Sequence, residues 1–118
     1  MTDTGEVRTV SSTGGAKGVK PARFEMIPAD SLWELAEHFG KGTAKYPSAD
    51  GLDNWRRGYE WSKSFGALLR HAFKALGGED IDPESGISHI AHVAASAMIV
   101  MDAANQGTLE MDRPPKKS

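Results

Sequence analysis

The sequence predicts an all-α fold, a small helical bundle that is completed by oligomerisation. Two stretches, 59–76 and 83–106, repeat apolar residues every three or four positions, which is typical of helices with one buried face. The chain has only 118 residues, and neither end shows this periodicity. The folded part is therefore small for a solitary core, and we expect a homo-oligomer, either a dimer or a tetramer.

The first predicted helix spans residues 31–39 and ends at Gly40. Ser31 and Glu34 have the spacing of a capping box, in which each side chain bonds a backbone N–H at the helix start. Glu34 and Glu37 lie three residues apart on another face and could chelate one metal ion together. A solvated acidic face explains the same spacing and is the preferred interpretation from spacing alone.

Residues 40–60 are predicted to form a loop, and a loop of this length is often functional. It contains aromatic, amide and cationic side chains, which can stack a base, read its edge and hold phosphate. The candidates are Lys45, Tyr46, Asn54 and Trp55. Trp55 could equally anchor the core.

The second and third predicted helices, 59–76 and 83–106, form an antiparallel pair. The glycines at 77–78 end the first of them, because glycine accepts the left-handed conformation of a helix C-cap. Asp82 is expected to be the N-cap of the next helix, with Pro83 as its first residue. A connection this short makes the two helices neighbours.

Most of the chemically versatile side chains surround this connection. They are His71, Glu79, Asp80, Asp82, Glu84, His89 and His92. Antiparallel packing puts His71 and His89 at similar heights, close to the acidic hairpin tip. Imidazole and carboxylate groups that converge from two helices are what a divalent-metal site needs. Taken singly, each residue has a structural explanation, such as helix capping by Asp82.

The segment 14–28 combines Lys20 and Arg23 with several glycines and prolines, which makes helix and regular strand unlikely. Its cations could wrap anionic oxygens, or they could form a solvated basic loop. The spacing of a P-loop is absent.

Composition sets the remaining bounds. We expect residues 1–14 to be disordered, 15–111 to form one helical domain and 112–118 to form a flexible tail. The chain has no cysteine, which excludes disulfides and thiolate zinc sites. A net charge of −2 gives no argument for nucleic-acid binding. No apolar run is long enough for a membrane span and no signal peptide is recognisable, so we expect a cytoplasmic protein.

Several segments, in this order, form a specific pattern. They are GVKPARFEMIP (18–28), LAEHFGKGTAKY (35–46), NWRRGYEW (54–61), Arg-His (70–71), GEDIDPESG (78–86) and His89. In these segments the chain resembles a phage-associated family, the dATP/dGTP diphosphohydrolases, also described as MazZ-like. The resemblance implies an all-α, MazG-like enzyme that cleaves a deoxynucleoside triphosphate to the monophosphate and pyrophosphate. The MazG pattern of EExxE followed by ExxD is not met in full.

Cleavage of a triphosphate to the monophosphate and pyrophosphate suggests candidate roles for the residues named above. The expected cofactor is Mg²⁺, or Mn²⁺ or Co²⁺ if histidine takes part. The metal candidates are Glu37, Glu79 and Asp82. The catalytic candidates are His71, Glu79 and His89. The substrate-binding candidates are Lys20, Arg23, Lys45, Tyr46, Asn54, Trp55 and Arg70.

Two other functions fit the same residues. One is a non-catalytic helical protein that binds a nucleotide or a partner, which the incomplete MazG pattern favours. The other is a metal-dependent phosphatase that releases inorganic phosphate or tripolyphosphate. For the pyrophosphohydrolase that the resemblance implies, the expected substrate is a deoxynucleoside triphosphate, which is consumed when a phage remodels the nucleotide pool.

Overall fold

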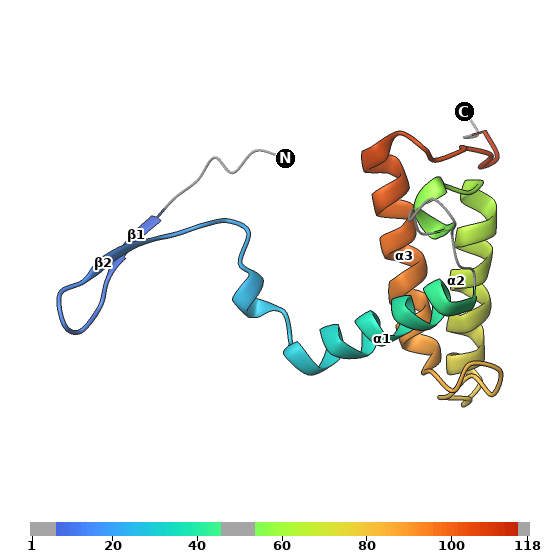
Figure 1. Cartoon of the computed structure of the whole chain (residues 1–118), viewed down its shortest axis with the longest axis horizontal. Helices are drawn as coiled ribbons and strands as arrows, with labels where there is room; N and C mark the ends of the chain where they lie inside the picture. The colour runs from blue at the N-terminus through green and yellow to red at the C-terminus, as the bar shows by residue number, and fades with distance from the viewer. Residues whose placement is uncertain (1–6, 46–53, 116–118) are drawn as a thin grey trace. The chain divides into compact units, whose positions relative to one another are not determined.

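The computed structural model describes residues 7–45 and 54–115 (Figure 1). The chain divides into two units, Met1–Leu32 and Trp33–Ser118. No helix among the described residues is both long and apolar enough to cross a membrane.

The first unit contains a two-stranded antiparallel sheet, so the prediction of an all-α fold is wrong, although most of the regular structure is helical. β1 (Val7–Val10) pairs with β2 (Ala16–Val19), with Val7 opposite Val19. β2 lies within the segment 14–28, where we considered a regular strand unlikely because of the glycines and prolines. β1 lies within the segment 1–14, for which we expected disorder.

The turn of this hairpin explains why the glycine-rich segment forms strands. Gly14 has a φ of 90°, a left-handed conformation that glycine adopts without strain. The Ser11 N–H donates to the carbonyl of Gly15 at 2.7 Å, which closes the turn. Val7, Val10 and other β-branched residues beside it favour extended backbone. Glycine therefore positions a hairpin here instead of preventing one.

After the short helix η1 (Phe24–Met26), α1 spans Ala29–Lys45 and continues into the second unit. It begins before the predicted capping box, and the Leu32 N–H donates to the carbonyl of Pro28 at 3.0 Å. The helix also passes through Gly40, where we expected it to end. A glycine weakens a helix by about 1 kcal/mol relative to alanine but does not break it.

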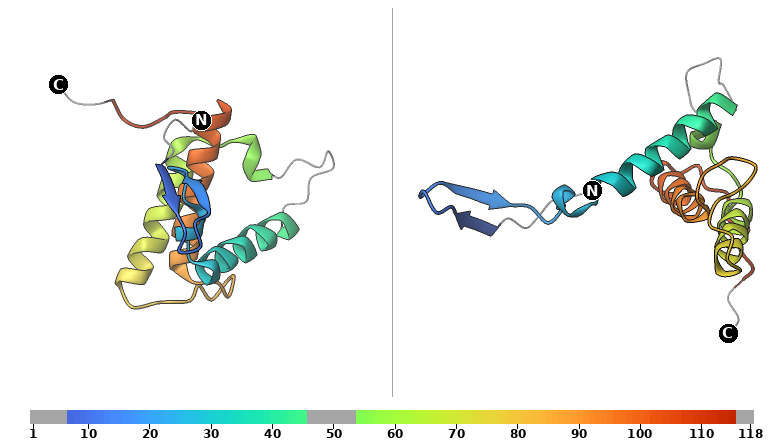
Figure 2. Two further views of the ribbon diagram at one scale, coloured as in Figure 1. Left: turned by 90° about the vertical axis from the view of Figure 1, so that its left-hand side faces the viewer. Right: turned by 90° about the horizontal axis from the view of Figure 1, so that it is seen from below.

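The second unit is built on two antiparallel helices, α2 (Trp61–Leu76) and α3 (His89–Gln106), which pack along each other. Figures 1 and 2 show them side by side in every view. The predicted helix pair is thus confirmed, as is the end of α2 at Gly77. Gly78, with a φ of 99°, turns the chain away from the helix.

The start of α3 differs from the prediction. Ser88 is the N-cap, and its side chain accepts a hydrogen bond from the Ala91 N–H at 3.0 Å. Asp82 instead accepts hydrogen bonds from the Glu84 N–H and the Ser85 hydroxyl within the connecting loop. Gly86, with a φ of 74°, interrupts helical backbone before Ser88. The segment 77–88 is therefore a folded loop, which frees Asp82 to face the cleft described below.

The other end of the helix pair is held by the segment after α3. The Trp61 N–H donates to the carbonyl of Glu110 at 2.7 Å, and the Ser62 N–H donates to the Asp112 carboxylate at 2.8 Å. The short helix η2 (Asn54–Arg57) packs on α3 nearby. Asp112, the first residue of the expected tail, thus caps α2.

The apolar core of the described residues is small. Its buried hydrophobic members are Ile87, Ala91, Ala95 and Ala103. Large apolar side chains on α2 stay exposed, including Phe73 at 66% and Leu76 at 80%. The alanines on α3 allow α2 to approach closely, but they contribute little buried area.

Candidate functional site

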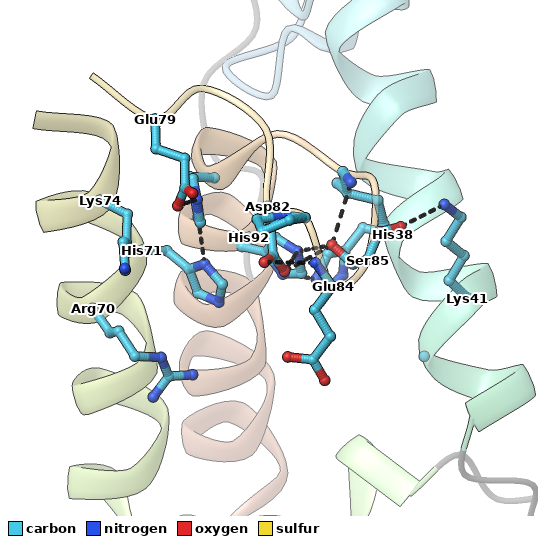
Figure 3. A pocket seen from close by; sticks show the side chains of 14 residues that line it. His38, Lys41, Arg70, His71, Lys74, Glu79, Asp82, Glu84, Ser85 and His92 are labelled. Carbon is cyan, nitrogen blue, oxygen red and sulfur yellow. Dashed lines mark hydrogen bonds and ion pairs between the residues drawn. The ribbon is translucent and has the colours of Figure 1, made fainter. Parts of the chain in front are cut away.

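A cleft of about 870 Å³ lies in the second unit (Figure 3). It is lined by side chains from α1, α2, the loop 77–88 and the first turn of α3. The chain has four histidines, and all of them line this cleft: His38, His71, His89 and His92. Their convergence from three helices makes the cleft the candidate site.

One side of the cleft is a hydrogen-bonded chain from Glu79 through His89 to His71. Nε2 of His89 lies 2.8 Å from a carboxylate oxygen of Glu79, and Nδ1 of His89 lies 2.8 Å from Nδ1 of His71. A carboxylate only accepts, so Nε2 of His89 carries the proton. Nδ1 of a neutral His89 then accepts from His71. This arrangement leaves Nε2 of His71 with a lone pair.

A second chain runs from His38 through His92 and Ser85 to Asp82. Nε2 of His38 lies 2.7 Å from Nδ1 of His92, and Nε2 of His92 lies 2.8 Å from the Ser85 hydroxyl. Ser85 donates its single proton to Asp82 at 2.9 Å. His92 must therefore donate to Ser85 through Nε2 and accept from His38 through Nδ1.

The two chains meet where the rings of His71 and His92 stack, with centroids 4.1 Å apart and planes 4° apart. One ligand atom each from His71, Asp82 and His92 lies within 4.8 Å of the other two. Two imidazoles and one carboxylate suit manganese, cobalt or zinc better than magnesium, which prefers oxygen. The donor set therefore fits a divalent ion, but not the oxygen cage that Mg²⁺ favours.

Burial favours the neutral form of three imidazoles of the cleft, those of His38, His71 and His92. It lowers the pKa of His92 to about 4, and the nearby rings of His38 and His71 lower this pKa further. Burial also lowers the pKa values of His38 and His71. The pKa of Asp82 lies below its usual value: burial raises it, but hydrogen bonds from Ser85 and the Glu84 N–H outweigh this. Neutral imidazole beside ionised carboxylate is the protonation state that metal ligands need.

Cations line the cleft on both sides. Arg70 and Lys74 lie one turn apart on α2. Neither side chain forms a hydrogen bond or ion pair within the part of the chain that the structure describes, so both charges are available to an anion. Lys41 on α1 instead donates to the carbonyl of Ser85 at 2.9 Å, which holds the loop.

The structure brings together five of the residues predicted from sequence. His71, Glu79, Asp82, His89 and Arg70 all line the cleft. The expectation that His71 and His89 lie at similar heights is confirmed by their hydrogen bond. His89 is only 2% exposed, so it can act only through its neighbours.

Two other predicted residues of the second unit do not line the cleft. Glu37 is exposed on α1, and Trp55 packs against Phe39 with ring centroids 4.9 Å apart. Lys20 and Arg23 belong to the first unit, where Arg23 pairs with Glu25 at 2.7 Å.

Three predictions cannot be compared with the structure. Tyr46 lies outside the described residues. Lys45 ends α1 and Asn54 begins η2, and their side chains also lie outside the described part.

Sequence reasoning missed His38, Lys41, Lys74 and Ser85, and it placed His92 in the metal-site cluster without giving it an individual role. A signal for His38 was present, because a chain with only four histidines places three of them around the helix connection. No sequence spacing shows that α1 brings His38 against His92.

The neutral imidazoles predict how stability depends on pH. The unfolded chain binds a proton at each histidine near pH 6.5, whereas folded His92 binds one only near pH 4. The unfolded state therefore binds more protons in this window, and stability falls as the pH drops from 6.5 toward 4. Urea unfolding with a chelator present, at about pH 7.5 and about pH 5, should show a lower midpoint at the acidic pH. His92→Gln should flatten the difference, and an equal midpoint for the parent protein would contradict the account.

Comparison with known proteins agrees with the pattern seen in the sequence. A family model described as dATP/dGTP diphosphohydrolase, N-terminal, matches residues 11–113. The match includes the hairpin strand β2, all three α-helices and every residue of the cleft. Comparisons with curated proteins and with solved structures gave no match. The resemblance noted in the sequence is confirmed, and the chain belongs to the dATP/dGTP diphosphohydrolase N-terminal family.

Proposed function

We propose that the chain is a divalent-ion-dependent diphosphohydrolase that converts dATP or dGTP to the monophosphate and pyrophosphate, in the remodelling of a deoxynucleotide pool. One observation carries the proposal: the cleft combines a candidate metal-binding group with two available cations on α2. A triphosphate needs both features, because its charge must be neutralised while pyrophosphate departs. Family membership supports a deoxynucleoside triphosphate as the substrate class.

The residues of the chain contribute mainly by positioning. Arg70 can hold a phosphate group through two parallel hydrogen bonds, and Lys74 adds a point charge one turn further along α2. Lys41 fixes the loop that carries Asp82 and Ser85. A divalent ion held by His71, Asp82 and His92 would supply charge neutralisation and would make a nearby water more acidic.

Product analysis tests this function. The full-length protein, incubated with each of the four deoxynucleoside triphosphates and a divalent ion, should release monophosphate and pyrophosphate in equal amounts. Lys74→Ala should lower kcat/KM about tenfold or more, because a charge-assisted hydrogen bond contributes about 1.5–3 kcal/mol. Lys63→Ala is the matched control: Lys63 lies on the same helix, pairs with Glu60 and does not line the cleft.

The other outcomes of this assay separate the competing functions. Release of inorganic phosphate or tripolyphosphate would identify a phosphatase. Nucleotide binding without any product would identify a binding protein. An equal loss of kcat/KM in Lys74→Ala and Lys63→Ala would show that the cleft is not the catalytic site.

We also propose that the chain works as a homo-oligomer. Leu69, Phe73 and Leu76 form an apolar stripe on α2 that is 44–80% exposed, and Met98 and Met101 on α3 are also exposed. The buried alanines alone are a small core for a chain of this length. A second copy, which carries the same apolar surface, would bury both stripes.

Light scattering coupled to size-exclusion chromatography should give at least twice the chain mass of 12.7 kDa. Phe73→Glu should shift the protein toward monomer, because it places a charge in the apolar contact. Lys63→Glu, at another exposed position of α2, should not. A monodisperse parent monomer at micromolar concentration would contradict the proposal.

A further inference from the structure

We infer that the cleft binds a transition-metal ion of the Mn²⁺, Co²⁺ or Zn²⁺ class through His71, Asp82 and His92. The catalytic role of this ion rests on the proposed function. The binding of the ion does not depend on that function. It differs from the sequence-based expectation of a magnesium site at Glu37, Glu79 and Asp82.

The first argument for a metal site is the spacing of the donor atoms. Nε2 of His92 lies 3.4 Å from a carboxylate oxygen of Asp82. Two ligands of one tetrahedral ion, each about 2.1 Å from it, lie about 3.4 Å apart. The matching atom of His71 lies within 4.8 Å of both. Three donors from α2, the loop and α3 thus lie close together in the cleft.

The second argument is the hydrogen bonding of His71 to His89, and of His89 to Glu79. A metal-bound imidazole nearly always donates its other N–H to a partner that fixes the ring. Nδ1 of His71 donates to His89, and Glu79 holds His89 in turn. The nitrogen left for an ion is Nε2. Glu79 therefore acts as an outer partner of this ligand and not as a ligand itself.

His38 supports His92 as His89 supports His71. Nε2 of His38 lies 2.7 Å from Nδ1 of His92, which leaves Nε2 of His92 for the ion. Binding at Nε2 displaces the proton that His92 shares with Ser85. The proton between the rings then belongs to Nδ1 of His92, and His38 takes one proton at its own Nδ1. That atom is buried and has no hydrogen-bond partner among the described residues. Both rings stay neutral, so proton count and charge balance.

Glu79 and Glu84 also line the cleft, but neither belongs to the group whose ligand atoms lie together. Glu79 is engaged by His89, and Glu37 does not line the cleft. Asp82 is the carboxylate that lies beside the two imidazoles. A site with two nitrogen donors favours later first-row ions over magnesium.

Metal binding to the full-length protein tests the inference without any use of activity. After chelator treatment and dialysis, calorimetric titration should show Co²⁺ binding at least tenfold more tightly than Mg²⁺. Asp82→Asn should weaken Co²⁺ binding at least tenfold. Asp102→Asn, the same change at a position on α3 outside the cleft, should leave the affinity within twofold.

Proton NMR of the Co²⁺-loaded protein identifies the ligands. Two strongly shifted resonances that disappear in D₂O should appear, one for the Nδ1–H of each ligand histidine. His71→Asn and His92→Asn should each remove one of them. Glu79→Gln should keep both, because the glutamine carbonyl still accepts from His89.

Equal affinities of the parent protein for Mg²⁺ and Co²⁺, or the absence of shifted exchangeable resonances, would overturn the inference even if a variant fails to fold. These results would leave the proposed function standing if pyrophosphate is still released. Conversely, tight Co²⁺ binding without pyrophosphate release would support the metal site and contradict the proposed function.

Discussion

The candidate site depends on one constraint: wherever two side chains of the histidine cluster form a hydrogen bond, one must donate and the other must accept. Glu79 and Asp82 terminate the two hydrogen-bonded chains, because each carboxylate can only accept. The tautomers of His89 and His92 follow from these two acceptors. Satisfied polar networks in a low-dielectric environment are rigid, and this rigidity is what holds ligand atoms at fixed separations. The apolar core is too small to do this alone.

The small side chains of α3 connect the packing of the helices to the chemistry of the cleft. Ala91 and Ala95 are buried on the face of α3 that packs in the core. Alanine allows close approach of a neighbouring helix, and the ring of His71 on α2 then reaches to within stacking distance of His92. Larger residues at these alanines would separate the rings and so separate the donor atoms.

Sequence patterns predicted the parts of the fold that depend on local periodicity. The helix pair and the end of α2 at Gly77 follow from apolar spacing and glycine chemistry, and both were found. The hairpin was missed because its strands are short and its glycines suggested irregular structure. The start of α3 was misplaced because Asp82 followed by Pro83 has the same sequence signature in a loop as at a helix N-terminus. The sequence predicted that His71 and His89 lie at similar heights along the helix pair. The contact of His38 with His92 depends on the packing of α1, which no sequence spacing encodes.

We propose that histidines, and not an oxygen cage, hold a divalent ion in this cleft. X-ray absorption spectroscopy at the cobalt edge of the Co²⁺-loaded protein tests it most directly, because bound imidazole rings give a characteristic multiple-scattering pattern. The account predicts a first shell of two imidazole nitrogens together with oxygen donors. A shell of oxygen atoms alone, without the imidazole pattern, would contradict it.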